Sequence, residues 1–422
     1  MHIKDLLKLG VIRKSDSRHR SAAFIVRKHS EIIRGKSRMV INYKRLNDNT
    51  IDDAYTIPDK TVLINKIQDC NIFSKFDLKS GFWQVKMHPD SIEWTAFTSP
   101  EGHYEWLVMP FGLKNAHSIF QRKMENIFNK HSKFIIVYID DILVFSKNKR
   151  EHRGHLQILF SEFIKHGLIV NKKKMMLFKE YIEFLGVNIG KGKIELQPHI
   201  AQKALEFPDK LEDLKQLQKF LGLVNYARPF IRDLGKIAGP LYGKTSPKGQ
   251  RYFNIEDIKL VQKIKERLKD LPKLDMPLDT DYLIIETDGS LTGWGAILIA
   301  KPNKYAGKDL EKIVRYNSGN YKEKGNISSI DLELLAVNYA LDSFELFIIS
   351  KKEITLRTDC EAIVSFVNKM KLENKRSNRR RWLNFIDRIT NIGLIINFEH
   401  IKGSNNQIAD ILSRIIKNKD YD

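Results

Sequence analysis

The stretch that decides the fold runs from Phe134 to Phe145 and has the sequence Phe-Ile-Ile-Val-Tyr-Ile-Asp-Asp-Ile-Leu-Val-Phe. Apolar, mostly β-branched and aromatic residues flank two acids, Asp140 and Asp141, which is typical of two strands joined by a tight turn. The sequence therefore predicts a β-hairpin with both carboxylates at its tip. Solvent exposure alone also favours acids in turns, so the pair needs further support before it indicates a functional site.

A third acid gives that support. Asp77 ends an apolar run that begins at Ile72, and this run is long enough to form a strand that pairs with the hairpin. Phosphoryl transfer to a growing strand needs carboxylates that hold two divalent metal ions roughly 3.5 to 4 Å apart. Asp77, Asp140 and Asp141 are therefore candidate metal ligands.

Length and composition narrow the class of protein. The 422 residues exceed what one hydrophobic core commonly holds, so we expect at least two domains. The 72 Lys and Arg residues outnumber the 51 Asp and Glu residues, and the net charge of +21 favours a polyanionic partner. Nucleic acid is the first candidate, although anionic membranes and ribosomes also select basic proteins.

The cysteines and the longest apolar runs exclude other classes. Cys70 and Cys360 lie far apart in the sequence, so neither a disulfide framework nor a zinc site is expected, and a reducing compartment is indicated. No apolar run that we find approaches the roughly 20 residues that span a bilayer. We therefore expect a soluble protein.

Hydrophobic periodicity divides the chain into regions. Alternating apolar and polar residues predict a basic β-hairpin in residues 20–47, and residues 115–129 are helix-like. Helical spacing returns in residues 211–224 and 254–268. We place the main domain boundary in the proline-containing loop near 275–280, after which the predicted order is β-β-β-α-β-α-α-β-α.

Five motifs, in the same order, resemble those of reverse transcriptases. They are Phe76-Asp77-Leu78-Lys79-Ser80-Gly81-Phe82, Met109-Pro-Phe-Gly-Leu-Lys-Asn-Ala116, Tyr138-Ile139-Asp140-Asp141, Asn171 to Lys174, and Phe184-Leu185-Gly186. The chain resembles in particular the polymerases of plant pararetroviruses (the caulimovirus family, especially its bacilliform badnavirus and tungrovirus branch). Gypsy-type long terminal repeat retrotransposons are similar as well. One departure is His117, where the family usually has proline, and we expect it to alter a turn or helix start and not the chemistry.

The resemblance implies roles for residues near the first set of acids. Asp77, Asp140 and Asp141 are the implied metal ligands of the polymerase. Arg38 is implied to clamp the incoming triphosphate with Lys28 as its partner, which agrees with the phosphate contacts that a basic hairpin tip offers. A solvated run of charges is the alternative for both residues.

Three more residues are implied to contact the substrate. Phe82 is implied to exclude the 2′-hydroxyl of the incoming nucleotide, Phe111 to pack against its base, and Lys174 to protonate the leaving pyrophosphate. The alternatives are a core aromatic for Phe82 and a solvated face for Lys172 to Lys174.

A second set of acids follows residue 280. Its members are Asp288, Glu333, Asp359 and Asp410. Four carboxylates can hold two metal ions for hydrolysis. Their order, with the predicted strands and helices between them, resembles the RNase H domain of reverse transcriptases, which implies that they are its catalytic set. We choose Glu333 over Asp331 because Glu333 directly precedes Leu-Leu-Ala, as in the family.

Two basic features accompany this second set. His400 lies in a segment that we expect to be a mobile, glycine-containing loop, and the resemblance implies that it assists catalysis or product release; a plain loop histidine is the alternative. Residues 371–382 include Arg379, Arg380 and Arg381, and we expect them to grip the phosphates of an RNA/DNA hybrid. The alternative for this segment is a solvated helix start.

The fold implied by the resemblance is α+β and multidomain: a right-hand polymerase followed by an RNase H-like α/β domain with a mixed five-stranded sheet. We expect fingers and palm in residues 1–190 and a helical thumb in 191–245. A short helical linker or connection follows in 246–278, and the RNase H domain occupies 279–422.

The implied function is that of an RNA- and DNA-dependent DNA polymerase with ribonuclease H activity, which replicates a viral DNA genome through an RNA intermediate. We expect two Mg²⁺ ions per active site, with Mn²⁺ as a possible substitute. The expected partners are RNA/DNA hybrid, DNA template-primer and dNTPs, with no membrane. We expect a monomer in the host cytoplasm and virion, not secreted and cut or cloned from a larger polyprotein.

Two other functions are alternatives for a basic chain of this kind. A basic nucleic-acid-binding or capsid-associated module with degenerate sites would lack some of the acids, yet none of the seven expected carboxylates is missing from the sequence. A domesticated cellular polymerase would have less reason to retain the RNase H half.

Overall fold

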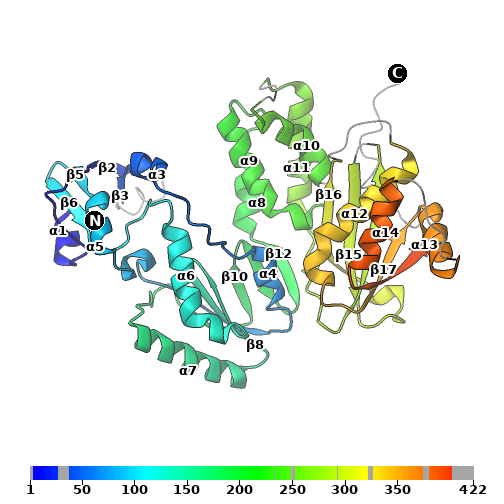
Figure 1. Cartoon of the computed structure of the whole chain (residues 1–422), viewed down its shortest axis with the longest axis horizontal. Coiled ribbons are helices and arrows are strands. Elements are labelled where there is room, and N and C mark those ends of the chain that lie inside the picture. Colours follow the sequence, from blue (N-terminus) through cyan, green and yellow to red (C-terminus); the bar gives the residue numbers. More distant parts are fainter. Residues whose placement is uncertain are drawn as a thin grey trace. The chain divides into compact units, whose positions relative to one another are not determined.

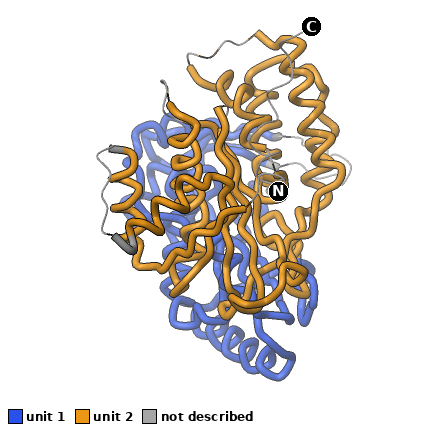
Figure 2. The backbone as a smooth tube through the Cα atoms, turned by 90° about the vertical axis from the view of Figure 1, so that its right-hand side faces the viewer, with its two compact units in different colours: residues 1–182 blue, residues 183–422 orange. Residues whose placement is uncertain are grey.

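The chain folds into two compact units, residues 1–182 and 183–422, which are described separately (Figure 2). Figure 1 labels the helices and strands. The computed structural model describes residues 3–26, 38–232, 234–247, 249, 252–291, 293–321, 327–373 and 380–401. Among these residues, no helix combines the length and the apolar character needed to cross a bilayer.

The first sheet of the first unit has five strands in the order β1-β6-β5-β2-β3. The strands are β1 (Ile12–Lys14), β2 (Ser21–Val26), β3 (Arg38–Ile41), β5 (Phe97–Ser99) and β6 (Gly102–Trp106). β2 and β3 pair antiparallel with Ala23 opposite Ile41, which confirms the hairpin predicted in residues 20–47. Phe97 of β5 and Trp106 of β6 are buried in the hydrophobic core of this sheet.

The second sheet of this unit carries the acidic hairpin. Its order is β7-β8-β4-β9, and the strands are β4 (Ile72–Asp77), β7 (Ile135–Tyr138), β8 (Asp141–Ser146) and β9 (Met176–Lys179). β7 and β8 pair antiparallel from Ile135 and Val144 to Tyr138 and Asp141, so the predicted hairpin is confirmed.

Two helices pack against the acidic hairpin and its sheet. α6 (Ala116–Phe128) confirms the helix predicted in residues 115–129, and α7 (Lys149–His166) follows β8. Their buried residues, which include Phe120, Met124 and Leu159, share one core with the strands. The shorter elements of the unit are α1 (Ile3–Lys8), α3 (Lys44–Asp48), α4 (Lys60–Asn65), η1 (Gly81–Gln84), α5 (Pro89–Ile92), η2 (Glu93–Thr95) and η3 (Asn129–His131).

The second unit begins with a small sheet and a group of helices. The sheet has the order β10-β11-β12-β13. These elements are β10 (Tyr181–Phe184), β11 (Val187–Gly190), β12 (Lys193–Leu196), α8 (Pro198–Leu205), α9 (Leu214–Tyr226), η4 (Arg228–Phe230), α10 (Leu234–Thr245), α11 (Ile255–Lys269) and β13 (Leu274–Asp275). α9 and α11 confirm the two predicted helices. α11 begins with a capping box between Asn254 and Asp257.

The rest of the second unit is built on a mixed five-stranded sheet, as predicted. Its order is β16-β15-β14-β17-β18: β14, β15 and β16 are antiparallel neighbours, whereas β14, β17 and β18 run parallel. The elements are β14 (Tyr282–Ser290), β15 (Gly293–Lys301), η5 (Lys308–Leu310), β16 (Lys312–Gly319), α12 (Ser329–Ile348), β17 (Glu353–Thr358), α13 (Glu361–Glu373), α14 (Arg380–Asn391) and β18 (Ile395–His400).

One face of this sheet is covered by helices. Side chains alternate between the two faces of a strand, and Leu283 and Ile285 point toward α12, where they join Leu334, Val337 and Phe344 in one core. On β14, the alternate positions, which include Asp288, therefore belong to the other face.

Two candidate active sites

The first site begins with Asp77 and Asp141, which lie directly opposite each other where β4 and β8 pair antiparallel. Their neighbours Phe76 and Ile142 are also opposite each other and are fully buried in the core. Because successive side chains of a strand point to opposite faces, both carboxylates point away from that core. The register of the two strands thus brings two of the predicted ligands together.

Asp140 lies at the hairpin tip, where the backbone is strained. The preceding residue, Ile139, has φ 53°, a left-handed conformation that is unfavourable for a β-branched side chain. Gln121 of α6 stabilises this turn, since its Oε1 accepts a hydrogen bond from Ile139 N at 2.6 Å and its Nε2 donates to Val137 O at 2.9 Å. A Cβ atom on Gly81 would lie 2.5 Å from Asp140 Oδ1, so only glycine fits there.

Two lysines hold the other two carboxylates. Lys75 Nζ lies 3.1 Å from Asp141 Oδ1, and Lys174 Nζ lies 3.1 Å from Asp77 Oδ2. The turn that carries Lys174 starts at Asn171, whose N–H donates to Asp77 O at 2.8 Å. Lys174 is therefore at the site, as predicted. Lys75 was missed, although its position two residues before Asp77 placed it on the same face of the strand.

The three acids of this site act on one another. Burial raises the pKa of Asp140, and the charges of Asp77 and Asp141 raise it further. No described residue donates a hydrogen bond to the buried Oδ1 of Asp140. A buried carboxylate oxygen among like charges, with no such donor, has the chemistry of a ligand for a divalent cation.

Aromatic rings line the neighbouring region. Phe82 is 3% exposed, and its ring centroid lies 5.1 Å from those of Phe111 and His117 and 5.3 Å from that of Phe120. Phe111 is partly exposed, as a residue that contacts a base would be. The contact of His117 with Phe82 means that the departure from the family pattern reaches the site and is not confined to the start of α6.

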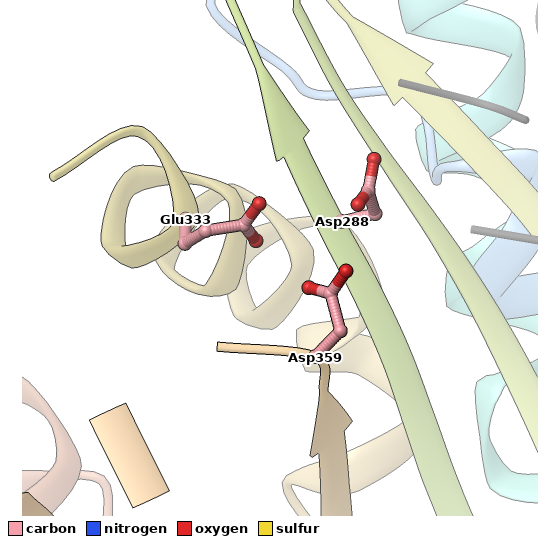
Figure 3. Close-up of side chains that lie close together, drawn as sticks. All are labelled: Asp288, Glu333 and Asp359. Carbon is pink, nitrogen blue, oxygen red and sulfur yellow. The ribbon is translucent and has the colours of Figure 1, made fainter. Parts of the chain in front are cut away.

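The second site joins Asp288, Glu333 and Asp359 (Figure 3). One ligand oxygen from each of them lies within 4.8 Å of the others. Thr287 of β14 pairs with Thr358 of the parallel strand β17. The acids that follow these two residues, Asp288 within β14 and Asp359 just past the end of β17, therefore lie on neighbouring strands at the same level of the sheet.

Glu333 reaches the same place from α12. Its Oε2 accepts a hydrogen bond from Gly289 N at 2.9 Å, and a Cβ atom on Gly289 would lie 2.7 Å from Leu332 O. The missing side chain at Gly289 thus allows α12 to approach the strand. Asp331, the competing acid, instead lies 3.1 Å from Arg381 Nη1. The structure therefore brings Glu333 to the cluster and not Asp331.

Crowding of these acids has an electrostatic consequence. Burial raises the pKa of Glu333 to about 9, and the charges of Asp288 and Asp359 add to the effect. In the absence of a cation, the cluster therefore retains a proton at neutral pH. Clustered carboxylate oxygens are the donor set that Mg²⁺ and Mn²⁺ prefer, so the residues present fit such ions.

His400 also lies beside this cluster. It is the last residue of β18, paired with Thr358, and its Nε2 lies 3.2 Å from Asp359 O. The expectation that His400 lies on a mobile loop is wrong, because β18 pairs with β17 along its whole length. The role in catalysis or product release that the resemblance implies for His400 stays a prediction.

The remaining predicted residues are only partly described. Arg38 is the first residue of β3, opposite Val26, and Arg380 is the first residue of α14. Lys28, Arg379 and Asp410 lie outside the described residues.

Two family models match the chain. Residues 26–189 match the model described as reverse transcriptase (RNA-dependent DNA polymerase). Residues 279–388 match the model described as an RNase H-like domain found in reverse transcriptase. The two matches contain the first and the second site, respectively.

Relatives with these features include viral polyproteins. Polyprotein P3 of Commelina yellow mottle virus is 48% identical over 97% of this chain, and the enzymatic polyprotein of Cauliflower mosaic virus (strain CM-1841) is 44% identical over 98%. The chain spans 22% of the length of the first polyprotein and 60% of the second.

Solved structures share the fold. A foamy viral protease-reverse transcriptase in complex with double-stranded DNA aligns with a TM-score of 0.79 at 23% identity, covering 94% of this chain and 68% of that one. The same kind of protein in complex with RNA/DNA hybrid aligns with a TM-score of 0.74 at 21% identity, covering 100% of this chain and 55% of that one.

Proposed function

Because this chain belongs to the reverse transcriptases of the caulimovirus type that carry an RNase H-like domain, we propose that it copies RNA and DNA templates into DNA and degrades the copied RNA. The observation that carries the proposal is the presence of two separate carboxylate sites, one in each compact unit. Each site has the residue types that phosphoryl transfer or phosphodiester hydrolysis requires.

In the polymerase reaction, the 3′-hydroxyl of the primer attacks the α-phosphate of a dNTP and pyrophosphate leaves. We assign Asp77, Asp140 and Asp141 as the ligands that organise this site. Lys174, now 3.1 Å from Asp77, would donate a proton to the leaving pyrophosphate. Arg38, with Lys28, would hold the triphosphate from the hairpin of β2 and β3.

In the nuclease reaction, a water molecule attacks a phosphodiester bond of the RNA strand. We assign Asp288, Glu333, Asp359 and Asp410 as the acids of this site. His400, which lies against Asp359 O, would assist catalysis or product release. Arg379, Arg380 and Arg381 would contact phosphates of the hybrid, with Arg381 first having to leave Asp331.

Divalent cations would supply charge neutralisation and activation of the attacking oxygen at both sites. We propose two Mg²⁺ ions per site, for which Mn²⁺ can substitute. The support is the donor chemistry: carboxylate oxygens within 4.8 Å at the second site, and the buried Asp140 Oδ1 at the first.

The proposed substrates are RNA/DNA hybrid, DNA template-primer and dNTPs. The net charge of +21 and the nucleic acids in complex with the similar solved proteins support this choice. We further propose that the protein acts as a monomer, in the host cytoplasm and the virion.

One experiment tests both activities. The purified chain is incubated with a labelled RNA template, a DNA primer, dNTPs and Mg²⁺, and both strands are followed on one gel. Primer extension with template fragmentation supports the proposal. If the chain binds the hybrid but changes neither strand, with Mn²⁺ also failing, it is a nucleic-acid-binding module instead.

Two variants separate the sites. Asp140→Asn should abolish extension and spare RNA cleavage, whereas Asp288→Asn should do the reverse. Thermal unfolding of each variant controls for misfolding. Loss of both activities in a folded single variant would contradict two independent sites.

A further inference from the structure

α10 packs on the five-stranded sheet, at the edge strand β16 (Figure 1). Gly235 N donates a hydrogen bond to Ser318 Oγ at 3.0 Å, and a Cβ atom on Gly235 would lie only 2.0 Å from Ser318 O. Gly239, one turn later, approaches Asn320 with similar closeness: a Cβ atom there would lie 2.3 Å from Asn320 Nδ2. Two glycines on one face of α10 thus allow a close approach.

The position of this contact relative to the second carboxylate site follows from strand register. Ser318 pairs with Gly295, and Gly295 pairs with Asp288. Directly paired residues share a face of the sheet, so Ser318, Gly295 and Asp288 form one row across three strands. Gly295, in the middle of this row, contributes no side chain between α10 and Asp288. α10 therefore contacts the sheet in line with the carboxylate cluster.

Lys236 follows Gly235 at this contact. It is 2% exposed, although lysine is rarely buried to this degree without a compensating charge. The contact of α10 with β16 brings this lysine close enough to the carboxylate cluster for its charge to interact with Glu333. The first turn of α10 therefore supplies a cation within electrostatic reach of the second site.

We propose that Lys236 is a positioning residue of the nuclease site: its buried ammonium group offsets the charge of the carboxylate cluster and thereby sets the site's affinity for divalent cations. This inference rests on the proposed nuclease role of the cluster. Lys236 lies outside the segment that matches the RNase H-like family model, so that segment does not contain the whole electrostatic environment of the site.

The charge of Lys236 should act in opposite directions on two measurable quantities. Without cations, it relieves repulsion among Asp288, Glu333 and Asp359 and so stabilises the fold. With cations, it repels them and weakens their binding. A merely structural lysine would affect the stability of the fold and leave the affinity for cations unchanged.

The test is the thermal unfolding of the full chain, in EDTA and over a titration with Mn²⁺. In EDTA, Lys236→Met should unfold at a lower temperature than the wild type. On addition of Mn²⁺, its unfolding temperature should increase by more than that of the wild type, and its affinity for Mn²⁺ should be roughly fivefold higher or more. Lys236→Arg should behave as the wild type does, because it retains the charge. Mn²⁺ binding at the carboxylate cluster accounts for the part of the increase in unfolding temperature that is lost in Asp288→Asn.

Lys244→Met is the matched control. Lys244 lies on the same helix and pairs with the buried Asp257 at 2.9 Å. Its loss should lower the unfolding temperature without changing the response to Mn²⁺. Lys236→Gln is measured in parallel, so that the proposal remains testable if Lys236→Met does not fold.

A double-mutant cycle adds a test that needs no cation. In EDTA, Lys236→Met should cost less stability in an Asp288→Asn background than in the wild type, because one of the charges that it offsets is gone. Additive effects, together with a response to Mn²⁺ equal to that of Lys244→Met, would overturn the role of Lys236. Absence of any Mn²⁺ response in the wild type would instead count against the proposed nuclease site.

Discussion

Gln121 and Ile139 are joined by a hydrogen bond of 2.6 Å, from the backbone N–H of Ile139 to the side-chain Oε1 of Gln121. Ile139 needs this support because its φ of 53° is unfavourable for a β-branched residue. The helix α6 thus fixes the backbone immediately before the predicted metal ligand Asp140.

We expect Gln121→Met to lower the free energy of unfolding by roughly 2 to 3 kcal/mol, because the buried Ile139 N–H and Val137 C=O lose their partner. Primer extension should fall more than 10-fold, and RNA cleavage should be unchanged. Equilibrium denaturation and the gel assay measure these quantities. Gln157→Met, at an exposed position of α7, is the control. Extension that persists at the wild-type rate would show that the turn does not need Gln121.

The family resemblance predicted a sugar-contacting role for Phe82, and its burial against three rings leaves the core alternative open. If Phe82 contacts the sugar, Phe82→Val should raise ribonucleotide incorporation at least 10-fold relative to dNTP incorporation. It should also cost about 1 to 3 kcal/mol of stability, because it leaves a cavity. Steady-state kinetics with dNTP and rNTP decide the question. A stability loss with unchanged discrimination would assign Phe82 to the core alone.

His152 should make the first unit sensitive to acid. It is fully buried, with Nε2 2.7 Å from Ser74 Oγ and Nδ1 2.8 Å from Ser146 Oγ, and burial, followed by the charge of His155, lowers its pKa to about 4. The unfolded chain, with a histidine pKa near 6.5, takes up this proton first as pH falls.

Stability should therefore decline between about pH 6.5 and pH 4, by roughly 2 to 3 kcal/mol in total from this group. Urea denaturation at several pH values measures the effect. His152→Gln should flatten the profile, whereas His88→Gln, at an exposed position, should not. An equal slope in wild type and His152→Gln would contradict the assignment.

Arg357 should be critical for the second unit. Its buried guanidinium binds Glu286 at 2.9 Å, Glu311 at 2.7 Å and Glu399 at 2.9 Å, which ties three segments together. Arg357→Met would leave these carboxylates without their cation and should cost about 3 to 5 kcal/mol at pH 7.

The control for Arg357 is Arg388→Met, which removes a more exposed ion pair with Asp342 and should cost less than about 1 kcal/mol. Denaturation curves at pH 7 measure both variants. A cost for Arg357→Met as small as that of Arg388→Met would mean that the three contacts contribute little.

The sequence predicted what depends on local patterns. Apolar, mostly β-branched and aromatic residues on both sides of two acids predicted the hairpin of β7 and β8, and the position of acids at the ends of predicted strands pointed to Asp288 and Asp359. Glu333 could be chosen over Asp331 only through the family resemblance, because both lie on one helix. The fold then gives the physical reason, since Gly289 lets α12 approach the strand and donates a hydrogen bond to Glu333, whereas Asp331 pairs with Arg381.

What could not be predicted depends on contacts between distant segments. Gln121 is one of many glutamines until α6 is placed beside the hairpin. Lys236 lies in a helix with no catalytic motif, and only the strand register from Ser318 to Asp288 relates it to the carboxylates. The prediction of a loop at His400 was wrong because it also depends on a contact between distant segments: the pairing with β17 determines where β18 ends.

The contact of α10 with β16 also determines how the chain can be divided. A recombinant fragment that starts at residue 279, where the RNase H-like match begins, would lack α10 and uncover the sheet face around Tyr316 and Ser318, both buried in the full chain. β16 is an edge strand, and an uncovered edge strand promotes self-association. Fragments intended for crystallisation or inhibitor screening should therefore begin before α10, even though α10 precedes the nuclease domain in sequence.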